Sequence, residues 1–239
     1  MKEVRFFYTP EPLTGILPDE EAQHAVRVLR LNSGDEIFLM DGCGSFYRAE
    51  ITDASRKHCL YRILETMPQQ RTWKGKLHLA MGPTKNMDRT EWFAEKATEI
   101  GFDHLTFLNC QWSERRTIKN ERIEKILVSA MKQSHKAWLP ELSEMTDCKT
   151  FIETPHTGRK FICHCHEEGL PLLKDLLFST TDNLDEDILV MIGPEGDFSQ
   201  EEVEAAEKAG FVSVSLGKSR LRTETAALVA VHLMHLARE

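Results

Sequence analysis

The sequence predicts an α/β protein, with a small, mainly β domain over residues 1–70 and an α/β domain over residues 75–239. Three observations lead to this prediction. Short β-type runs surround a single helical segment in the first seventy residues. From Lys76 onward, β-type runs alternate with helical segments, as in α/β architectures. Two of the last β-type runs each lead through a glycine-bearing loop into a helix, the usual layout at the ligand-binding edge of an open sheet.

The first domain is predicted to be a small barrel with one helix. Helical spacing covers residues 19–29, and a glycine-rich turn at 41–44 joins two β-type runs into a hairpin. The expected strands are 4–8, 36–40, 46–51 and 58–64. The polar, proline-bearing segment 67–71 is a natural linker to the next domain.

The second domain is predicted to alternate strands and helices to the end of the chain. Ser199 with Glu202 three residues later forms a capping box, which places a helix start there. The last helix is apolar nearly all round over 226–231, and such a helix must be buried. The expected strands are 77–81, 105–108, 161–165, 188–192 and 212–215, and the expected helices are 89–100, 120–133, 199–209 and 223–238.

The composition is typical of a globular cytoplasmic protein. The 239 residues are 41% hydrophobic and 28% charged, which is enough to bury sizeable cores. No apolar leader is expected, and the longest apolar stretch, 226–237, is broken by two histidines and too short to span a bilayer. The six cysteines show no C-x-x-C pairing, so we expect reduced thiols.

The formal net charge of −8 is unusual for a protein that binds nucleic acid. Residues 113–136, however, hold seven Lys/Arg against three Asp/Glu, a local charge of +4. This segment either meets phosphates or is a solvated helix face, and charge alone leaves both interpretations open. Its basic residues are Arg115, Arg116, Lys119, Arg122, Lys125, Lys132 and Lys136.

Two glycine-bearing loops carry the strongest functional signal. The first, 192–199, continues an apolar β-type run, and the second, 216–226, follows a short one. Glycine lets the backbone approach a ligand closely, so we expect the loops to form two walls of one small-molecule pocket. Neither loop is a phosphate cradle, because the chain contains no G-x-x-x-x-G-K-[ST] and no G-x-G-x-x-G.

These loops resemble the signature loops of the SPOUT-class methyltransferases, in particular the RsmE family of ribosomal RNA uridine-N3 methyltransferases. The family pattern reads approximately IGPEGGFS..E and LG.RILRTETA, and this chain has IGPEGDFSQEE at 192–202 and LGKSRLRTETA at 216–226. Similarity continues at 5–7, 24–30, 34–37, 41–42, 85–89, 91, 96–101 and 133–134. The chain departs from the family at Asp197, usually glycine, at Lys218–Ser219, usually a proline-bearing stretch, and at His135–Lys136, commonly Gly-Arg.

The resemblance implies a fold, a cofactor and a substrate. The second domain would be a SPOUT-type α/β domain ending in a deep trefoil knot, and the first a PUA-like, RNA-binding β-barrel. The protein would be a cytoplasmic homodimer that uses S-adenosylmethionine and no metal. It would methylate N3 of a uridine in 16S ribosomal RNA, near the decoding centre of the assembled small ribosomal subunit.

The resemblance also implies site residues. The cofactor-binding residues would be Ile192, Gly193, Pro194, Glu195, Gly196, Leu216, Gly217, Leu221, Arg222, Thr223 and Thr225. The RNA-binding residues would be Arg5, Arg27, Arg30, Lys85, Arg89, Arg115 and Arg116. The catalytic candidates are Arg222, as a cation beside the uracil carbonyls or the cofactor carboxylate, and Glu224. Alternatively, Arg222 pairs with Glu195 or Glu224 to brace the loops, and for Glu224 we favour stabilisation of the last helix dipole over a role as general base.

Other motifs have simpler explanations. The metal-capable side chains of Cys163–His166 alternate across the two faces of the expected strand, so they cannot converge on one ion. Trp92, Trp112 and Trp138 are expected in the core or an interface rather than as base-stacking platforms. Two other functions stay open: methylation of another RNA position, and a non-catalytic ribosome-assembly factor with a vestigial pocket. The intact segment 222–225 argues against the second.

Overall fold

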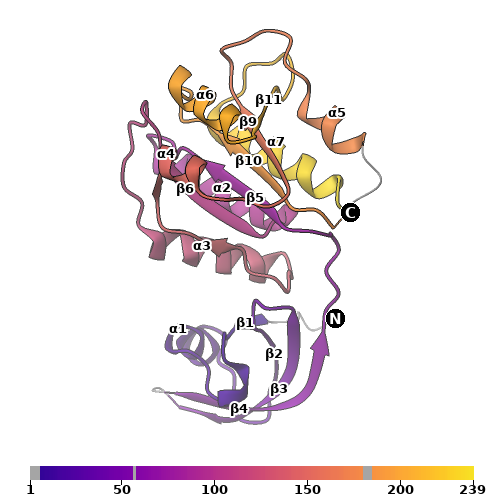
Figure 1. The fold of residues 1–239 in the computed structure, drawn as a ribbon. Coiled ribbons are helices and arrows are strands. Elements are labelled where there is room, and N and C mark those ends of the chain that lie inside the picture. Colours follow the sequence, from indigo (N-terminus) through magenta and orange to yellow (C-terminus); the bar gives the residue numbers. More distant parts are fainter. Residues whose placement is uncertain (1–5, 56–57, 180–184) are drawn as a thin grey trace. The chain divides into compact units, whose positions relative to one another are not determined.

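The computed structural model describes residues 6–55, 58–179 and 185–239. The chain divides into two compact units (Figure 1). One comprises Met1–Arg71 and Val128–Leu139, and the other comprises Thr72–Leu127 and Pro140–Glu239. The first predicted strand is described only from Phe6, and Arg5 lies outside the described residues.

The first unit is built on a four-stranded sheet in the order β1-β2-β3-β4. Its strands are β1 (Phe6–Tyr8), β2 (Glu36–Met40), β3 (Ser45–Ala54) and β4 (Cys59–Pro68). β1 is parallel to β2, and the other neighbours are antiparallel. A short 3-10 turn, η1 (Pro12–Thr14), precedes the predicted helix, which forms as α1 (Asp19–Gln23) and continues as the π-helical turn η2 (His24–Val28). Helix and sheet share one core, formed by Phe7, Leu17, Ala22, Ala25, Ile37, Leu39, Tyr47, Ala49, Ile51, Cys59 and Tyr61.

The turn between β2 and β3 packs against the indole of Trp138. Gly44 has a φ of 108°, and a Cβ at this position would lie 2.0 Å from the Trp138 ring. On the same indole, the Arg71 guanidinium lies 4.5 Å from the ring centroid. Trp138 is therefore a packed residue, as the sequence predicts.

The second unit is a parallel sheet with helices on both faces. The strand order is β11-β9-β10-β5-β6-β7, β8 also pairs with β6, and every pair is parallel. The strands are β5 (Leu77–Met81), β6 (His104–Asn109), β7 (Glu141–Leu142), β8 (Thr146–Asp147), β9 (Arg159–Cys163), β10 (Ile188–Ile192) and β11 (Val212–Val214). The helices are α2 (Met87–Ile100), α3 (Asn120–Gln133), α4 (Cys148–Glu153), α5 (Leu173–Phe178), α6 (Gln200–Lys208) and α7 (Thr223–Leu236).

Alternation along the strands separates two layers of helices. Ala80, Leu189 and Met191 pack with α4 and α6 in one core. Since neighbouring strand residues point to opposite faces, Leu79 and Val190 point to the other face. There α2 and α7 pack against one another, and α7 contacts β5 and β10. None of the helices of the described residues is long and apolar enough to cross a membrane.

One predicted strand begins and ends two residues earlier than expected. The run 161–165 was expected to be β throughout, but β9 ends at Cys163. The cause is a contact distant in sequence, because the Cys165 amide donates to Asp197 Oδ2 at 2.9 Å. Residues 164–166 therefore lie in a loop, and the expected alternation of metal-capable side chains across a strand is wrong for them.

Candidate active site at the carboxyl edge of the sheet

All loops that follow the central strands emerge at one edge of the sheet, because the strands are parallel. The two predicted loops lie at this edge, one after β10 and one after β11. Two further loops join them there, one after β5 and one after β6. The resemblance named Lys85, Arg115 and Arg116 in these two loops as RNA-binding residues, but only the structure shows that the loops pack on the two predicted ones.

The loop after β10 packs directly on the loop after β5. The Gly82 amide donates to the Ile192 carbonyl at 2.9 Å. A Cβ on Gly82 would lie 2.7 Å from Pro194 N, so only glycine permits this approach. Glu195 Oε1 accepts a hydrogen bond from the Lys85 amide at 2.8 Å. Glu195 therefore braces the two loops, and it does so through Lys85 rather than through Arg222.

The RsmE family usually has glycine at the position of Asp197, and the backbone conformation of Asp197 explains this preference. Its φ is 66°, in the left-handed region that side chains other than those of Gly, Asn and Asp seldom adopt. Its Oδ1 accepts from the Phe198 amide at 2.8 Å, and its Oδ2 accepts from the Cys165 amide at 2.9 Å. Asp197 thus stabilises the turn and links the loop after β10 to the loop after β9 through its hydrogen bonds.

The predicted capping box is present at the start of α6. The Glu202 amide donates to Ser199 Oγ at 3.2 Å, and the Ser199 amide donates to Glu202 Oε2 at 2.8 Å. The other oxygen, Glu202 Oε1, accepts from the Gln111 amide at 2.9 Å. The capping box therefore also anchors the loop that follows β6.

The loop after β6 closes the site from a third side. A Cβ on Gly196 would lie 2.8 Å from Trp112 Cβ, so these two backbones are in close contact. Arg115 donates to the Lys85 carbonyl at 2.7 Å and to the Thr84 carbonyl at 3.3 Å. Because its donors bind carbonyl groups, Arg115 holds the β5 loop in place.

The loop after β11 is open by comparison. Gly217 has a φ of 133°, and a Cβ there would meet no atom within 4 Å. Residues 217–220 are exposed, while Leu216 and Leu221 are half-buried. Arg222 lies at the N-cap of α7, and its exposed side chain makes no hydrogen bond or ion pair with any residue that the structure describes. The bracing pairs of Arg222 with Glu195 or Glu224 are therefore absent.

Glu224 is a buried carboxylate with one unsatisfied oxygen. It is the second residue of α7 and is 6% exposed. Its Oε1 lies 3.8 Å from Arg89 Nε, whereas its Oε2 has no hydrogen-bond partner among the described residues. The helix N-terminus stabilises the negative charge, but an unfilled buried acceptor is costly. Oε2 therefore marks a position where a donor from a ligand would fit. Its neighbours Thr223 and Thr225 are buried and half-buried.

The expected RNA-binding residues fall into two groups. Arg27 and Arg30 are exposed on the first unit. On the second unit, Lys85 pairs with Glu114 at 2.6 Å, and Arg89 is 40% exposed. Arg116 donates to Asn109 Oδ1 and to the Gln111 carbonyl, both at 3.3 Å.

Ion pairs partly neutralise the basic segment 113–136. Arg122 pairs with Glu91 at 2.6 Å, and Lys132 pairs with Glu21 in a half-buried position. Part of this basic segment is therefore engaged in ion pairs within the protein.

Cys110, Cys148 and Glu202 are the one group of described side chains with the spacing of metal ligands. Both oxygens of Glu202 already accept backbone hydrogen bonds. The hydrogen bond to Cys110 and burial both raise the pKa of the Cys148 thiol, which keeps it protonated. These contacts give the group a structural role, joining α4 and α6 to the β6 loop.

The chain matches two protein families along its length. Residues 71–235 match the RNA methyltransferase domain family, and residues 17–64 match the RNA methyltransferase PUA domain family. A ribosomal RNA small subunit methyltransferase E from Synechocystis is 30% identical, over 95% of this chain and 75% of that protein. This chain belongs to that methyltransferase family.

Solved structures of similar proteins extend the match to the whole fold. A probable rRNA-methyltransferase from Porphyromonas gingivalis is 43% identical, with a TM-score of 0.89 and 98% coverage of both chains. A ribosomal RNA small subunit methyltransferase E from Neisseria gonorrhoeae, bound to S-adenosyl methionine, is 27% identical with a TM-score of 0.84, again over 98% of both chains. The predicted fold class, a SPOUT-type α/β domain with a PUA-like N-terminal domain, is confirmed for this methyltransferase.

Proposed function

We propose that this protein transfers a methyl group from S-adenosylmethionine to N3 of a uridine in 16S ribosomal RNA, near the decoding centre of the small ribosomal subunit. The names of its relatives support the reaction class, and the structure from Neisseria gonorrhoeae contains the cofactor. One observation in this chain carries the proposal. Two residues stand at the end of a glycine-bearing loop: Arg222, a cation that pairs with no described residue, and Glu224, a buried carboxylate with one oxygen that no described group satisfies.

The residues at the edge of the sheet fit S-adenosylmethionine. Gly217 borders open space, and contacts with Gly82 and Lys85 hold the 193–197 loop in a defined shape. The first amides of α7 have no partner within the helix, so they are available to a ligand. We assign cofactor binding to Ile192, Gly193, Pro194, Glu195, Gly196, Leu216, Gly217, Leu221, Arg222, Thr223 and Thr225. When bound, the cofactor supplies an activated methyl group, so the protein has to supply position and electrostatics.

Two side chains would act on the uracil and the cofactor. Uracil N3 carries a proton at neutral pH, and negative charge develops on the ring when that proton leaves. The guanidinium of Arg222 stabilises this charge at a uracil carbonyl. Glu224 Oε2 accepts a hydrogen bond from an N–H donor of the bound ligands, and Arg89 holds the carboxylate in place.

We assign RNA binding to both domains, residues 1–70 and residues 75–239. In the first, Arg5, Arg27 and Arg30 would contact phosphates. In the second, Lys85, Arg89 and Arg116 would do so at the rim of the site. Arg115 was also expected to bind RNA, but its contacts with the Thr84 and Lys85 carbonyls favour a bracing role.

We further propose a cytoplasmic homodimer whose second domain ends in a trefoil knot, without a metal. The half-buried residues of α7, Leu228, Val229 and Leu233, and the exposed Leu236 support the dimer, because one chain leaves this side of an apolar helix partly uncovered.

Methyl transfer to small ribosomal subunits that lack the modification tests the proposal. Labelled S-adenosylmethionine should place its label on N3-methyluridine in 16S RNA, and digestion to nucleosides identifies the product. Label on another nucleoside would support the alternative RNA target. Cofactor that neither binds in calorimetry nor labels the RNA would support the assembly-factor alternative.

A further inference from the structure

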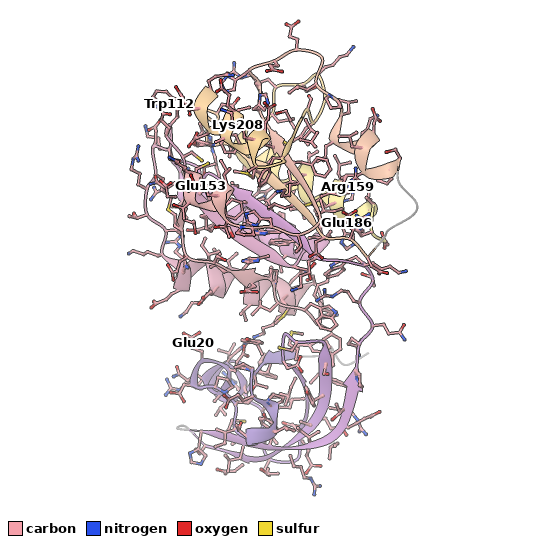
Figure 2. The ribbon with its side chains drawn as sticks, in the orientation of Figure 1. Glu20, Trp112, Glu153, Arg159, Glu186 and Lys208 are labelled. Atoms are coloured by element: carbon pink, nitrogen blue, oxygen red, sulfur yellow. The ribbon has the colours of Figure 1, made fainter. Side chains whose placement is uncertain are left out.

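Trp112 is a large apolar side chain that stands exposed at the rim of the candidate site. It lies in the loop after β6 and is 54% exposed. Figure 2 shows it at the opposite end of the sheet from Arg159 and Glu186, which lie at the starts of β9 and β10. Of the two expected locations, core or interface, the core is therefore excluded for this tryptophan. Its position is the edge where the cofactor loops meet.

The backbone that carries the indole is firmly held. The Gln111 amide donates to Glu202 Oε1 at 2.9 Å on one side of Trp112. On the other side, the Ser113 amide donates to the Cys110 carbonyl at 3.1 Å, and Ser113 Oγ accepts from the Cys110 amide at 3.0 Å. Gly196 packs against Trp112 Cβ from the cofactor loop. Because the backbone at this position is already held, the aromatic side chain loses little conformational entropy when a ligand packs on it.

The chemistry around the indole suits a polyanion with flat bases. No aromatic ring of the described residues stacks on Trp112. Arg115 and Arg116 follow it in the chain and bind only neutral oxygens, so their charges are not cancelled by an ion pair. The one acid beside them, Glu114, is paired with Lys85.

We propose that Trp112 is a positioning residue for the RNA, and that its indole stacks on an unpaired base next to the target uridine. This inference rests on the proposed function. Unpaired RNA bases are commonly held on aromatic side chains, at about 1–3 kcal/mol for each base. The indole would place the neighbouring base while the loops after β10 and β11 hold the cofactor. The family signature loops do not include this position, which is why the sequence motif gave no hint of it.

The test compares Trp112→Ala and Trp112→Phe with the unchanged protein and with Trp92→Ala. Trp92 is a matched control, because it is 42% exposed but lies on α2 rather than on a loop of the site. Binding to small ribosomal subunits is measured by co-sedimentation, methyl transfer by kcat and KM, and cofactor affinity by calorimetry. Trp112→Ala should weaken subunit binding and raise KM by about 5- to 150-fold, the equivalent of ~1–3 kcal/mol. Its cofactor affinity should change less than about twofold, and Trp112→Phe should restore most of the binding.

Two outcomes would overturn the inference. One is subunit binding by Trp112→Ala that equals that of the unchanged protein. The other is a parallel loss of cofactor affinity, which would mean that Trp112 only supports the 193–197 loop through Gly196. Failure of the proposed function looks different: the unchanged protein would not form N3-methyluridine, while co-sedimentation would still report whether Trp112 contributes to RNA binding.

Discussion

At the residue scale, Arg222 and Glu224 are two positions apart but have opposite environments. Arg222 is exposed and has no partner among the described residues, so little in the fold depends on its side chain. Glu224 is buried with an unsatisfied oxygen, which a purely structural residue would be expected to avoid. Both environments fit the proposed roles, in which these side chains find their partners in a ligand.

Arg222→Ala should lower kcat for methyl transfer by about 100-fold or more, the usual effect of losing one preorganised donor at a developing charge. The thermal midpoint should hardly change, because the side chain is exposed. Arg222→Lys should recover only part of the rate, since a point charge does not reproduce the planar guanidinium. Near-normal turnover in Arg222→Ala would contradict the assignment.

Glu224→Gln tests the buried acceptor in the same assay. The amide keeps the shape of the side chain, so the protein should stay folded. Because the negative charge and one acceptor oxygen are removed, we expect a comparable loss of methyl transfer, by roughly 100-fold. Stability should be unchanged or higher, because a buried charge with an unsatisfied oxygen is removed. A lower unfolding midpoint with normal kcat would instead assign Glu224 to the helix dipole alone.

At the element scale, three histidines lie together on one face of the sheet. The rings of His78 on β5 and His104 on β6 stack with centroids 4.2 Å apart, and the His156 ring lies 6.3 Å from that of His78. Burial, followed by the nearby His104 and His156, lowers the pKa of His78 from 6.5 to about 3. Burial likewise lowers the pKa of His104. The folded sheet therefore keeps these rings neutral.

Stability should consequently fall when the solution becomes acidic. The unfolded chain takes up a proton at His78 below its ordinary pKa of 6.5, whereas the folded chain does so only near pH 3. Folding is thus penalised progressively between these values, by about 2 kcal/mol at pH 5 from His78 alone. Urea unfolding at pH 7 and pH 5 measures the difference. His78→Gln, which keeps a donor near Thr106, should show a smaller pH dependence, and equal dependence in both proteins would refute this explanation.

At the scale of the whole molecule, the charge distribution and the uncovered side of α7 indicate how the protein meets its partners. Arg115, Arg116 and Arg222 form no ion pair with another described residue, although the net charge of the chain is −8. The last helix buries Ala227, Ala230, Val231 and Met234, while Leu236 at its end is 43% exposed. A second copy of the chain would cover this side.

Light scattering after size-exclusion chromatography should therefore give twice the chain mass of 27.4 kDa. Leu236→Glu should shift the protein toward monomer, because a carboxylate would have to be desolvated in the interface. Leu13→Glu is the control, since Leu13 is 85% exposed on the first unit. A monomeric mass for the unchanged protein, or equal dissociation by both variants, would exclude α7 as the dimer surface.

Much of this molecule follows from local signals in its sequence. Helical spacing placed α2 and α3, the Ser199–Glu202 capping box placed the start of α6, and alternation of strands with helices predicted the α/β architecture of the second domain. Each of these signals lies within one turn or one strand, so neighbouring residues suffice to specify it. The two signature loops are equally local, and they were sufficient to identify the family.

The contacts between loops were decided only by the tertiary structure. Strands β10 and β5 are neighbours in space but more than one hundred residues apart in the chain, and their adjacency brings Gly82 to Pro194 and Lys85 to Glu195. β6 lies next to β5 in the sheet, and the loop that follows β6 places Trp112 against Gly196. The sequence by itself determined the elements and the family, because periodicity, caps and motifs are short-range. The strand order determined which side chains meet at the site and which, like Glu224 Oε2, have no partner among the described residues, because parallel pairing joins segments that no local pattern connects.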